Sequence, residues 1–358
     1  MNTRKKRVTL KDIAEAAGLS TASVSMILAG KSLSRFSSVT VDTVYTIARQ
    51  LGYETKRTKR DRKVILLVCP SVINPYYATI IQGMEQEAKA RGLQTLLITT
   101  YWDTEKERWI CDFAKDPLVA GVVFAMIPQQ PELVHELNKL IPVVAVGDKQ
   151  NELGLDTVDV NNYNAGMLVG NHLLEMGHAQ IAYITTSLNS QHSARVRRLE
   201  GLRAAIKQAP HHQGKQLHIF TEEISAHTEL HTVDIEHRVG YTLAKRCLQE
   251  RPQVTAMVAI NDMVAYGVMD AIIDAGHQIP EEYSVCGFDN IYPSHFSGVG
   301  LTTVEHSIIQ RGKSAIRLIE SKIDRTGLSM TENEPGAVTR VEYQSRLIVR
   351  NSSNHTVT

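Results

Sequence analysis

The stretch LKDIAEAAGLSTASVSMILAG, Leu10–Gly30, contains two short helical patterns on either side of one glycine. The apolar residues of the first pattern recur at helical spacing, at Leu10, Ile13, Ala14 and Ala17. Thr9 is a candidate N-cap for this helix, and Gly18 is a residue that can end it. The second pattern begins after Ser20, another good N-cap residue, and its apolar face holds Val24, Ile27 and Leu28. The stretch therefore predicts two helices joined by a tight turn.

A third helical pattern follows at 39–52, in the sequence VTVDTVYTIARQLG, and Gly52 ends it. Its apolar residues fall on one face, at Val41, Val44, Ile47, Ala48 and Leu51. Two short helices braced by a third match a helix-turn-helix module, whose second helix enters the major groove of DNA. A helical hairpin that only packs on the rest of the chain is the alternative.

The charge distribution separates this region from the rest of the chain. The net charge is only +1, but residues 1–63 carry 14 Lys and Arg against 5 Asp and Glu, whereas the remaining residues carry 25 against 33. A basic head on an acidic body favours contact between the head and a polyanion, with a solvated basic tail as the alternative. The residues ETKRTKRDRK at 54–63 are polar and basic and predict an exposed linker.

The composition is that of a soluble globular protein, with 43% apolar and 22% charged residues in a chain of 358, enough for two or three domains. No apolar run is long enough to span a bilayer, and no hydrophobic signal core follows the basic start MNTRKKR. We therefore expect a cytoplasmic protein without membrane contact. Four cysteines lie far apart and predict reduced, buried thiols, at Cys69, Cys111, Cys247 and Cys286. No metal and no cofactor is expected.

From Val64 onward, short apolar runs alternate with helical patterns. The runs are rich in Val and Ile and read VILLVCP, LQTLLIT, AGVVFAM, IPVVAVG, QIAYITT, AMVAIN and YSVCGFD. This alternation predicts an α/β fold of parallel, doubly wound sheets covered by helices on both faces. The strands are too many for one comfortable sheet, so we expect two lobes with a cleft beyond the carboxyl ends of the strands. We find no nucleophile elbow, P-loop or dinucleotide fingerprint, so an enzyme is not favoured.

Several motifs resemble the lactose-repressor (LacI/GalR) family of bacterial transcription regulators. VTLKDIAEAAGLSTASVSMIL resembles the opening signature of that family, and NPYYATIIQGMEQEAKARG resembles the first helix of its effector domain. EMGHAQIAYIT and VRRLEGLRAA resemble the start of its second lobe. The most specific match is VAINDMVAYGVMDAIIDAGHQIPEEYSVCGFDN, followed by LTTVEH. The resemblance covers about residues 8–53 and 64–350.

The resemblance implies an all-α helix-turn-helix domain at 1–53, a short basic linker at 54–63, and a two-lobed, periplasmic-binding-protein-like α/β domain at 64–350 for effector binding and dimerisation. The expected first lobe comprises about 64–161 and 299–325, the second about 162–298 and 326–350, and 351–358 is a tail. The implied protein is a homodimer whose heads read the two halves of a near-palindromic operator in double-stranded DNA. A small molecule in the cleft then changes the relative orientation of the lobes.

The implied function is repression of a carbohydrate-utilisation operon under the control of a sugar or sugar derivative. Activation is left open. A solute-binding protein without a DNA role is the alternative, although it would need a signal peptide and no basic head.

Family correspondence places the base-reading positions on the second helix, at Thr21, Ala22 and Met26. Ala22 and Met26 can contact only apolar features such as thymine methyl groups. The residues expected near DNA phosphates are Ser20, Ser25, Thr9, Lys31, Lys56 and Arg57.

In the cleft, Asp289 of GFDN follows an apolar strand, where its carboxylate can accept hydrogen bonds from sugar hydroxyls. Arg198 of RRLEG matches the ligand-binding arginine of the family. Tyr76 and Tyr77 follow the first strand and can stack on a ring face. The further hydrogen-bonding candidates are Asn161 and Asn261.

Three features depart from the family pattern. Only 11 residues separate Tyr53 from Ile65, and they hold no leucine that could wedge into the minor groove. Ile235 stands where many relatives have a stacking aromatic residue. The segment between Gly201 and Gly240 is longer than usual and rich in histidine, at His211, His212, His218, His227, His231 and His237. We interpret its HTELH sequence as an exposed polar loop, because the glutamate is misplaced for a zinc-protease motif.

Overall fold

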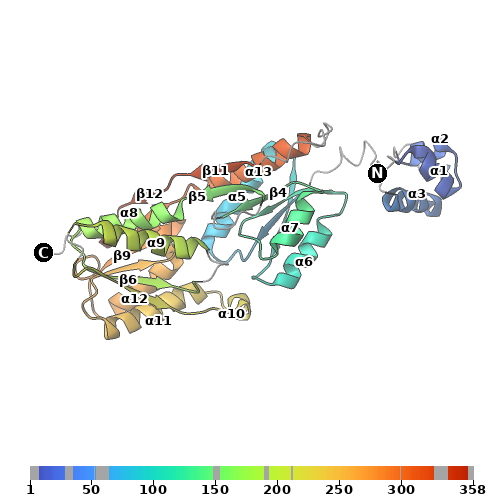
Figure 1. Ribbon diagram of the computed structural model, residues 1–358. Helices are drawn as coiled ribbons and strands as arrows, with labels where there is room; N and C mark the ends of the chain where they lie inside the picture. The colour runs from blue at the N-terminus through green and yellow to red at the C-terminus, as the bar shows by residue number, and fades with distance from the viewer. Residues whose placement is uncertain are drawn as a thin grey trace. The chain divides into compact units, whose positions relative to one another are not determined.

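Figure 1 shows a computed structural model of the chain. The structure describes residues 8–28, 35–51, 53, 64–147, 154–188, 193–210, 213–298, 300–325 and 338–353. Near Val64 the chain divides into two compact units, which we call the head and the body. The predicted phosphate contacts at Lys31, Lys56 and Arg57, and the predicted linker at 54–63, lie outside the described residues.

The described part of the head contains the three predicted helices: α1 (Leu10–Ala17), α2 (Thr21–Leu28) and α3 (Ser38–Gln50). Their apolar faces form one small core, with Ile13, Val24, Ile27 and Val44 fully buried. Leu51 is 39% exposed, contrary to the sequence prediction. The reason is that α3 ends at Gln50, so Leu51 has left the helical register of the buried face.

The predicted caps of the head helices are confirmed. Thr9 and Asp12 form a capping box at the start of α1, and Gly18 ends this helix in the left-handed conformation at φ 64°. The Ser20 hydroxyl accepts a hydrogen bond from the Ser23 amide at 3.0 Å, which caps α2. Each cap uses a partner only a few positions away in the chain, so the turn is encoded locally.

The first lobe of the body is built on a six-stranded sheet of order β11-β5-β4-β3-β1-β2. Its strands are β1 (Val64–Cys69), β2 (Gln94–Thr99), β3 (Val119–Phe124), β4 (Val143–Val146), β5 (Asp156–Val160) and β11 (Arg340–Tyr343). Its helices are α5 (Pro75–Ala90), α6 (Thr104–Phe113), α7 (Pro131–Asn138) and α13 (Ile308–Arg325). The continuous apolar runs of β1, β3 and β4 are almost entirely buried, as expected for parallel strands covered by helices.

The second lobe has a sheet of order β12-β10-β9-β8-β6-β7. Its strands are β6 (Gln180–Thr185), β7 (Gln216–Thr221), β8 (Ala256–Ala259), β9 (Ser284–Asp289), β10 (Thr302–Glu305) and β12 (Arg346–Ile348). Its helices are α8 (Asn162–Glu175), α9 (Ser193–Gln208), α10 (Ala226–His231), α11 (Ile235–Glu250), α12 (Asp262–Asp274), and the short 3-10 helices η3 (Tyr292–His295) and η4 (Asn351–Ser353). The pairing is parallel from β7 to β10, and β12 joins β10 antiparallel.

The allocation of the last segments to the lobes differs from the sequence expectation. We expected 299–325 in the first lobe and 326–350 in the second, but β10 pairs with β9 of the second lobe and β11 pairs with β5 of the first. The described chain passes between the two sheets at 160–162, 305–308 and 343–346, so neither segment belongs wholly to one lobe. The predicted tail is wrong for its first residues, because Ser352 and Ser353 are buried and hydrogen-bonded to the second lobe.

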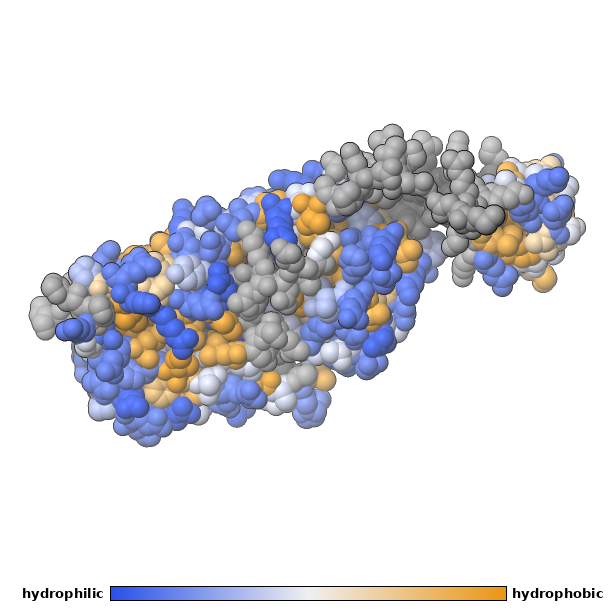
Figure 2. All heavy atoms as spheres, in the orientation of Figure 1, coloured by the Kyte–Doolittle hydropathy of each residue, from blue (hydrophilic) through white to orange (hydrophobic). Residues whose placement is uncertain are grey.

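Two further properties of the body concern its surface and its thiols. Figure 2 shows hydrophilic residues over most of the visible face of the body, interrupted by apolar areas. None of the described helices has the length and apolar character required to cross a bilayer. All four cysteines are buried and free, as the sequence predicts.

Candidate functional site

The outward face of α2 is small and uncharged. Thr21, Ala22 and Ser25 are exposed and Met26 is half-buried, whereas the alternating apolar residues face the core of the head. The Tyr45 hydroxyl, from α3, donates a hydrogen bond to the Ile27 carbonyl oxygen at 3.0 Å and so ties the end of α2 to its neighbour. The arrangement holds α2 against the other two helices and leaves its short side chains accessible, as a helix that enters a groove requires.

Two of the predicted phosphate contacts on the head, Thr9 and Ser20, already make hydrogen bonds within the head. The Thr9 hydroxyl donates to the Asp12 carboxylate at 2.8 Å, and the Ser20 hydroxyl lies 2.8 Å from that of Ser23. Both hydroxyls therefore stabilise helix starts first, and any phosphate contact is additional to that role. Ser25 lies exposed on α2.

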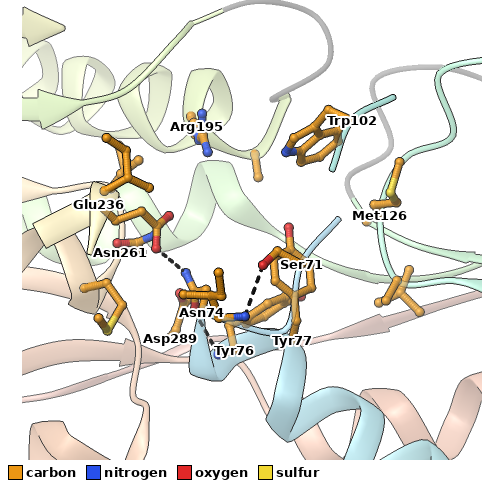
Figure 3. A pocket seen from close by; sticks show the side chains of 18 of the residues that line it. Ser71, Asn74, Tyr76, Tyr77, Trp102, Met126, Arg195, Glu236, Asn261 and Asp289 are labelled. Atoms are coloured by element: carbon orange, nitrogen blue, oxygen red, sulfur yellow. Dashed lines mark hydrogen bonds between the residues drawn. The ribbon is translucent and has the colours of Figure 1, made fainter. Parts of the chain in front are cut away.

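A pocket lies between the two lobes of the body, and Figure 3 shows its residues from close by. The first lobe contributes Asn74, Tyr76, Tyr77, Trp102, Met126 and Arg311. The second lobe contributes Arg195, Arg198, Glu236, Asn261 and Asp289. Most of these residues follow the carboxyl ends of strands of the two sheets, where parallel α/β folds bind ligands.

Arg198 is held on several sides by the second lobe. Its Nε donates to Asn162 Oδ1 at 2.9 Å, and its Nη1 donates to the Ile260 carbonyl oxygen. Its Nη2 lies 3.5 Å from Asp289 Oδ1, and its guanidinium carbon lies 4.6 Å from the centre of the Phe288 ring. Arg198 thus lines the pocket as predicted, but most of its donors already orient the pocket wall.

Asp289 ends β9 with a left-handed backbone, φ 107°, which is uncommon for a residue other than glycine. Its side chain is buried, and this desolvation raises the pKa of the carboxyl to about 8, although the Arg198 guanidinium opposes the shift. His306 Nε2 lies 3.9 Å away, and burial together with the guanidinium groups of Arg198 and Arg311 lowers the pKa of that imidazole. Near neutral pH the Asp289 carboxyl can therefore accept or donate a hydrogen bond.

Glu236 connects the two lobes and was missed in the sequence prediction. Its Oε2 accepts a hydrogen bond from Asn74 Nδ2 of the first lobe at 2.7 Å, and its Oε1 accepts one from Asn261 Nδ2 of the second lobe at 2.7 Å. Asn261 also caps α12 by accepting from the Val264 amide. Burial raises the pKa of Glu236. In the sequence, the one indication of a site near Glu236 was its neighbour Ile235, which stands where many relatives have a stacking aromatic residue.

Aromatic side chains line the first-lobe side of the pocket (Figure 3). The rings of Tyr76 and Tyr77 meet edge to face, with centroids 5.1 Å apart. Trp102 was missed in the sequence prediction, although it follows the apolar run LQTLLIT and so stands beyond the carboxyl end of β2. Tyr101 and Trp102 both have positive φ, at 53° and 60°. Such backbone conformations are typical of functional sites.

The structure places one predicted residue outside the pocket. Asn161 caps α8 by accepting a hydrogen bond from the Asn164 amide at 2.9 Å, and its neighbour Asn162 lines the pocket instead. The other predicted pocket residues line it, namely Tyr76, Tyr77, Arg198, Asn261 and Asp289.

The HTELH sequence forms the helix α10 and not the exposed polar loop that we predicted, and the chain after it approaches the pocket. The rings of His227 and His231 lie 4.4 Å apart on α10, and Thr232, Val233 and Asp234 line the pocket. Within the described residues, no three His, Cys, Asp or Glu side chains come together as metal ligands. His211 and His212 lie outside those residues.

Comparisons with known proteins cover both units of the chain. The family model described as "Bacterial regulatory proteins, lacI family" matches residues 9–56, and "Periplasmic binding proteins and sugar binding domain of LacI family" matches residues 62–347. The chain is 27% identical over 354 residues to the HTH-type transcriptional repressor PurR of Haemophilus influenzae (strain PittEE), covering 96% of this chain and 98% of that protein. It is 25% identical to the HTH-type transcriptional regulator DegA of Bacillus subtilis (strain 168), covering 97% and 98%.

A solved structure extends the comparison to the fold. A LacI family transcriptional regulator from Enterococcus faecium, crystallised with bound ribose, superposes with a TM-score of 0.67 at 26% identity and covers 83% of this chain and 100% of its own. A helix-turn-helix head joined to a two-lobed ligand-binding body defines a DNA-binding transcriptional repressor regulated by a small molecule. The chain belongs to the LacI family, whose members are regulators and not enzymes.

Proposed function

We propose that this repressor controls a carbohydrate-utilisation operon and that a sugar or sugar derivative, bound between the lobes, is its effector. The observation that carries the proposal is the composition of the pocket. Aromatic rings of Tyr76, Tyr77 and Trp102 can cover the apolar face of a sugar ring, and Asp289 and Asn261 offer polar groups to its hydroxyls. The ribose bound to the relative from Enterococcus faecium supports this ligand class.

The hydrogen bond between Asn74 and Glu236 suggests how ligand binding reaches the heads. This bond joins the first lobe to the second inside the pocket, so a ligand that competes for either group changes how the lobes are held. A ligand shifts an equilibrium only by its difference in affinity for the two states. We propose that the sugar stabilises one lobe orientation and that this orientation sets the operator affinity.

We propose a homodimer that binds a near-palindromic operator in the cytoplasm, where the chromosome lies. Exposed apolar residues support a covered face on the first lobe: Leu96 and Leu97 on the edge strand β2, and Trp109 and Phe113, whose stacked rings lie 5.3 Å apart on α6. Two-fold symmetry then presents two heads to two half-sites. The mass of the chain in solution, measured by analytical ultracentrifugation, tests this part directly.

We propose that each of the predicted domains has its own function. Residues 1–53 bind DNA, 54–63 link, and 64–350 bind the effector and dimerise. The proposed DNA contacts are Thr9, Ser20, Thr21, Ala22, Ser25, Met26, Lys31, Lys56 and Arg57. The proposed effector contacts are Tyr76, Tyr77, Arg198, Asn261 and Asp289, together with Trp102, Glu236 and Asn162, which the pocket geometry adds.

Fluorescence anisotropy with the DNA upstream of the gene tests the DNA-binding half. If the dimer neutralises roughly six phosphates, the logarithm of the binding constant falls with that of the salt concentration with a slope near −5. Thr21→Glu places a carboxylate on the exposed face of α2 and should abolish binding, whereas Thr46→Glu, an equally exposed change on α3, should not. Absence of an anisotropy increase at low salt, with and without sugars, would contradict the proposal.

Thermal shift with a panel of sugars tests the effector half. A ligand at 100 times its dissociation constant stabilises the body by about 2.7 kcal/mol. Arg198→Ala and Asp289→Ala should remove this shift and leave operator binding at low salt intact. Full retention of the shift in both variants would show that the ligand lies elsewhere.

A further inference from the structure

Arg311 is a buried cation on the wall of the pocket. It lies on α13 of the first lobe, is 2% exposed and lines the space between the lobes. Its Nη1 donates to the Tyr76 hydroxyl at 3.2 Å. Its Nε is buried and has no hydrogen-bond partner among the described residues, and no carboxylate of those residues lies within ion-pair distance of it.

Arg198 provides an internal comparison, because it lines the same pocket and is also buried. The Nε and Nη1 of Arg198 donate to protein oxygens, and its Nη2 faces the Asp289 carboxylate. Buried polar groups in native proteins are almost always paired, and an unpaired buried charge is costly. A guanidinium whose role is confined to the protein is expected to find its partners within the chain, as most donors of Arg198 do. The unpaired donor of Arg311 instead indicates a hydrogen-bond partner that is not part of the chain.

The other polar groups of the pocket indicate which further chemical groups the ligand has. Asp289, Asn261 and Glu236 lie on the second-lobe side and suit hydroxyl groups. On the first-lobe side the Arg311 guanidinium and the Tyr76 hydroxyl suit an anionic oxygen, because a guanidinium recognises carboxylate and phosphate groups with particular geometric fit.

We propose that the effector is an acidic carbohydrate, a sugar acid or a sugar phosphate, whose anionic group binds Arg311 and Tyr76 while its hydroxyls face Asp289 and Asn261. The inference rests on the proposed sugar effector and narrows its class. Burial favours the neutral forms of the Asp289 and Glu236 carboxyls, which weakens their repulsion of an anionic ligand.

The test is isothermal titration of the full-length chain with matched sets of ligands: glucose, glucuronate, gluconate and glucose 6-phosphate, and the corresponding galactose and ribose sets. At least one acid or phosphate should bind at least roughly 10-fold more tightly than its neutral parent. Comparison of the sugar acids with the sugar phosphates shows which anionic group the site prefers. A panel in which no anionic member binds better than its neutral parent overturns the proposal.

Variants of Arg311 assign the preference to this residue. Arg311→Met should weaken binding of the anionic ligand roughly 10- to 100-fold and leave the neutral parent unchanged. Without ligand, this variant should unfold at or above the wild-type temperature, since it removes an unpaired buried charge. Should the methionine variant fail to fold, Arg311→Lys keeps the charge but loses Nε and should still reduce the anion preference several-fold.

Arg317→Met is the matched control, because Arg317 lies on the same helix and pairs with Glu87 at 2.9 Å on the surface. It should bind every ligand as the wild type does. Retention of the anion preference in Arg311→Met also overturns the proposal. Operator binding without effector, measured on the same samples, separates this outcome from a failure of the repressor function.

Discussion

Polar side chains of the head and of the pocket find their hydrogen-bond partners at very different separations along the chain. In the head, Thr9 pairs with Asp12, Ser20 with Ser23 and Ser37 with Thr40, and each pair spans three residues at an exposed helix start. In the pocket, Arg198 reaches Asn162 over 36 residues and Asp289 over 91, and Asn74 reaches Glu236 over 162. The head is therefore specified by neighbours along the chain, whereas the pocket exists only when both sheets have formed.

This difference matches what each region must do. A helix that reads DNA needs a fixed backbone and free, short outward side chains, and local caps supply both. A pocket that senses a solute needs fixed donors and acceptors in a buried setting, where each unpaired group is costly. We therefore expect single substitutions of polar residues to affect stability strongly in the body and weakly in the head.

The largest expected effect is at Asp262 of the body. This carboxylate is fully buried and accepts hydrogen bonds from the Ile291 amide and from the hydroxyls of Ser294 and Thr303, the latter two at 2.6 Å. Asp262→Ala removes the common acceptor of these three buried donors and should lower the free energy of unfolding of the body by about 3–5 kcal/mol, measured by urea denaturation. Asp270→Ala, which breaks an exposed pair with His237, should change it by less than about 1 kcal/mol. Equal effects of the two substitutions would contradict the view that buried, long-range hydrogen bonds hold the body together.

A pH-dependent effect of intermediate size is expected at Asp289. Its pKa is about 8 in the folded body, whereas an unfolded aspartate has a pKa of about 3.9, so the folded state binds a proton that the unfolded state releases. The penalty from this carboxylate is absent at low pH and grows as the pH rises from about 4 to 8. Relative to Asp289→Asn, the wild type should lose about 3–4 kcal/mol of stability between pH 5 and pH 8. Urea denaturation at a series of pH values measures this difference, and a constant difference would contradict the assignment.

The smallest effect is expected in the head, at Ser20. Ser20→Ala removes the cap of α2 and should weaken this helix by about 1 kcal/mol. Hydrogen exchange of the α2 peptide, followed by mass spectrometry on the full chain, should report faster exchange. Ser25→Ala is the control, because an exposed serine within the helix is replaced by a better helix former, and exchange should not accelerate. Exchange of the body should be the same in both variants.

Much of the architecture could be predicted because its signals are local or periodic. The caps at Thr9, Gly18 and Ser20 depend on partners within a few residues, and the apolar runs that form β1, β3, β4 and β9 mark strands buried on both faces. Asn261 and Asp289 could be placed in the pocket because each follows such a run. The prediction of Asn161 as a pocket residue was wrong by one position, because Asn161 caps α8 and Asn162 faces Arg198. Only the backbone conformation at the start of α8 decides which of the two asparagines takes which role.

The sequence alone determined a capped three-helix head, a body of alternating strands and helices, and the strand ends at which a ligand binds, because period and capping act between near neighbours. Only the tertiary structure decided that β10 and β11 belong to different lobes, that Glu236 joins Asn74 across the pocket, and that Arg311 is buried with an open donor. These relations link residues far apart in the chain, such as Asn74 and Glu236 or Thr157 and Arg340. No local preference encodes them, because they depend on the path of the chain through two sheets.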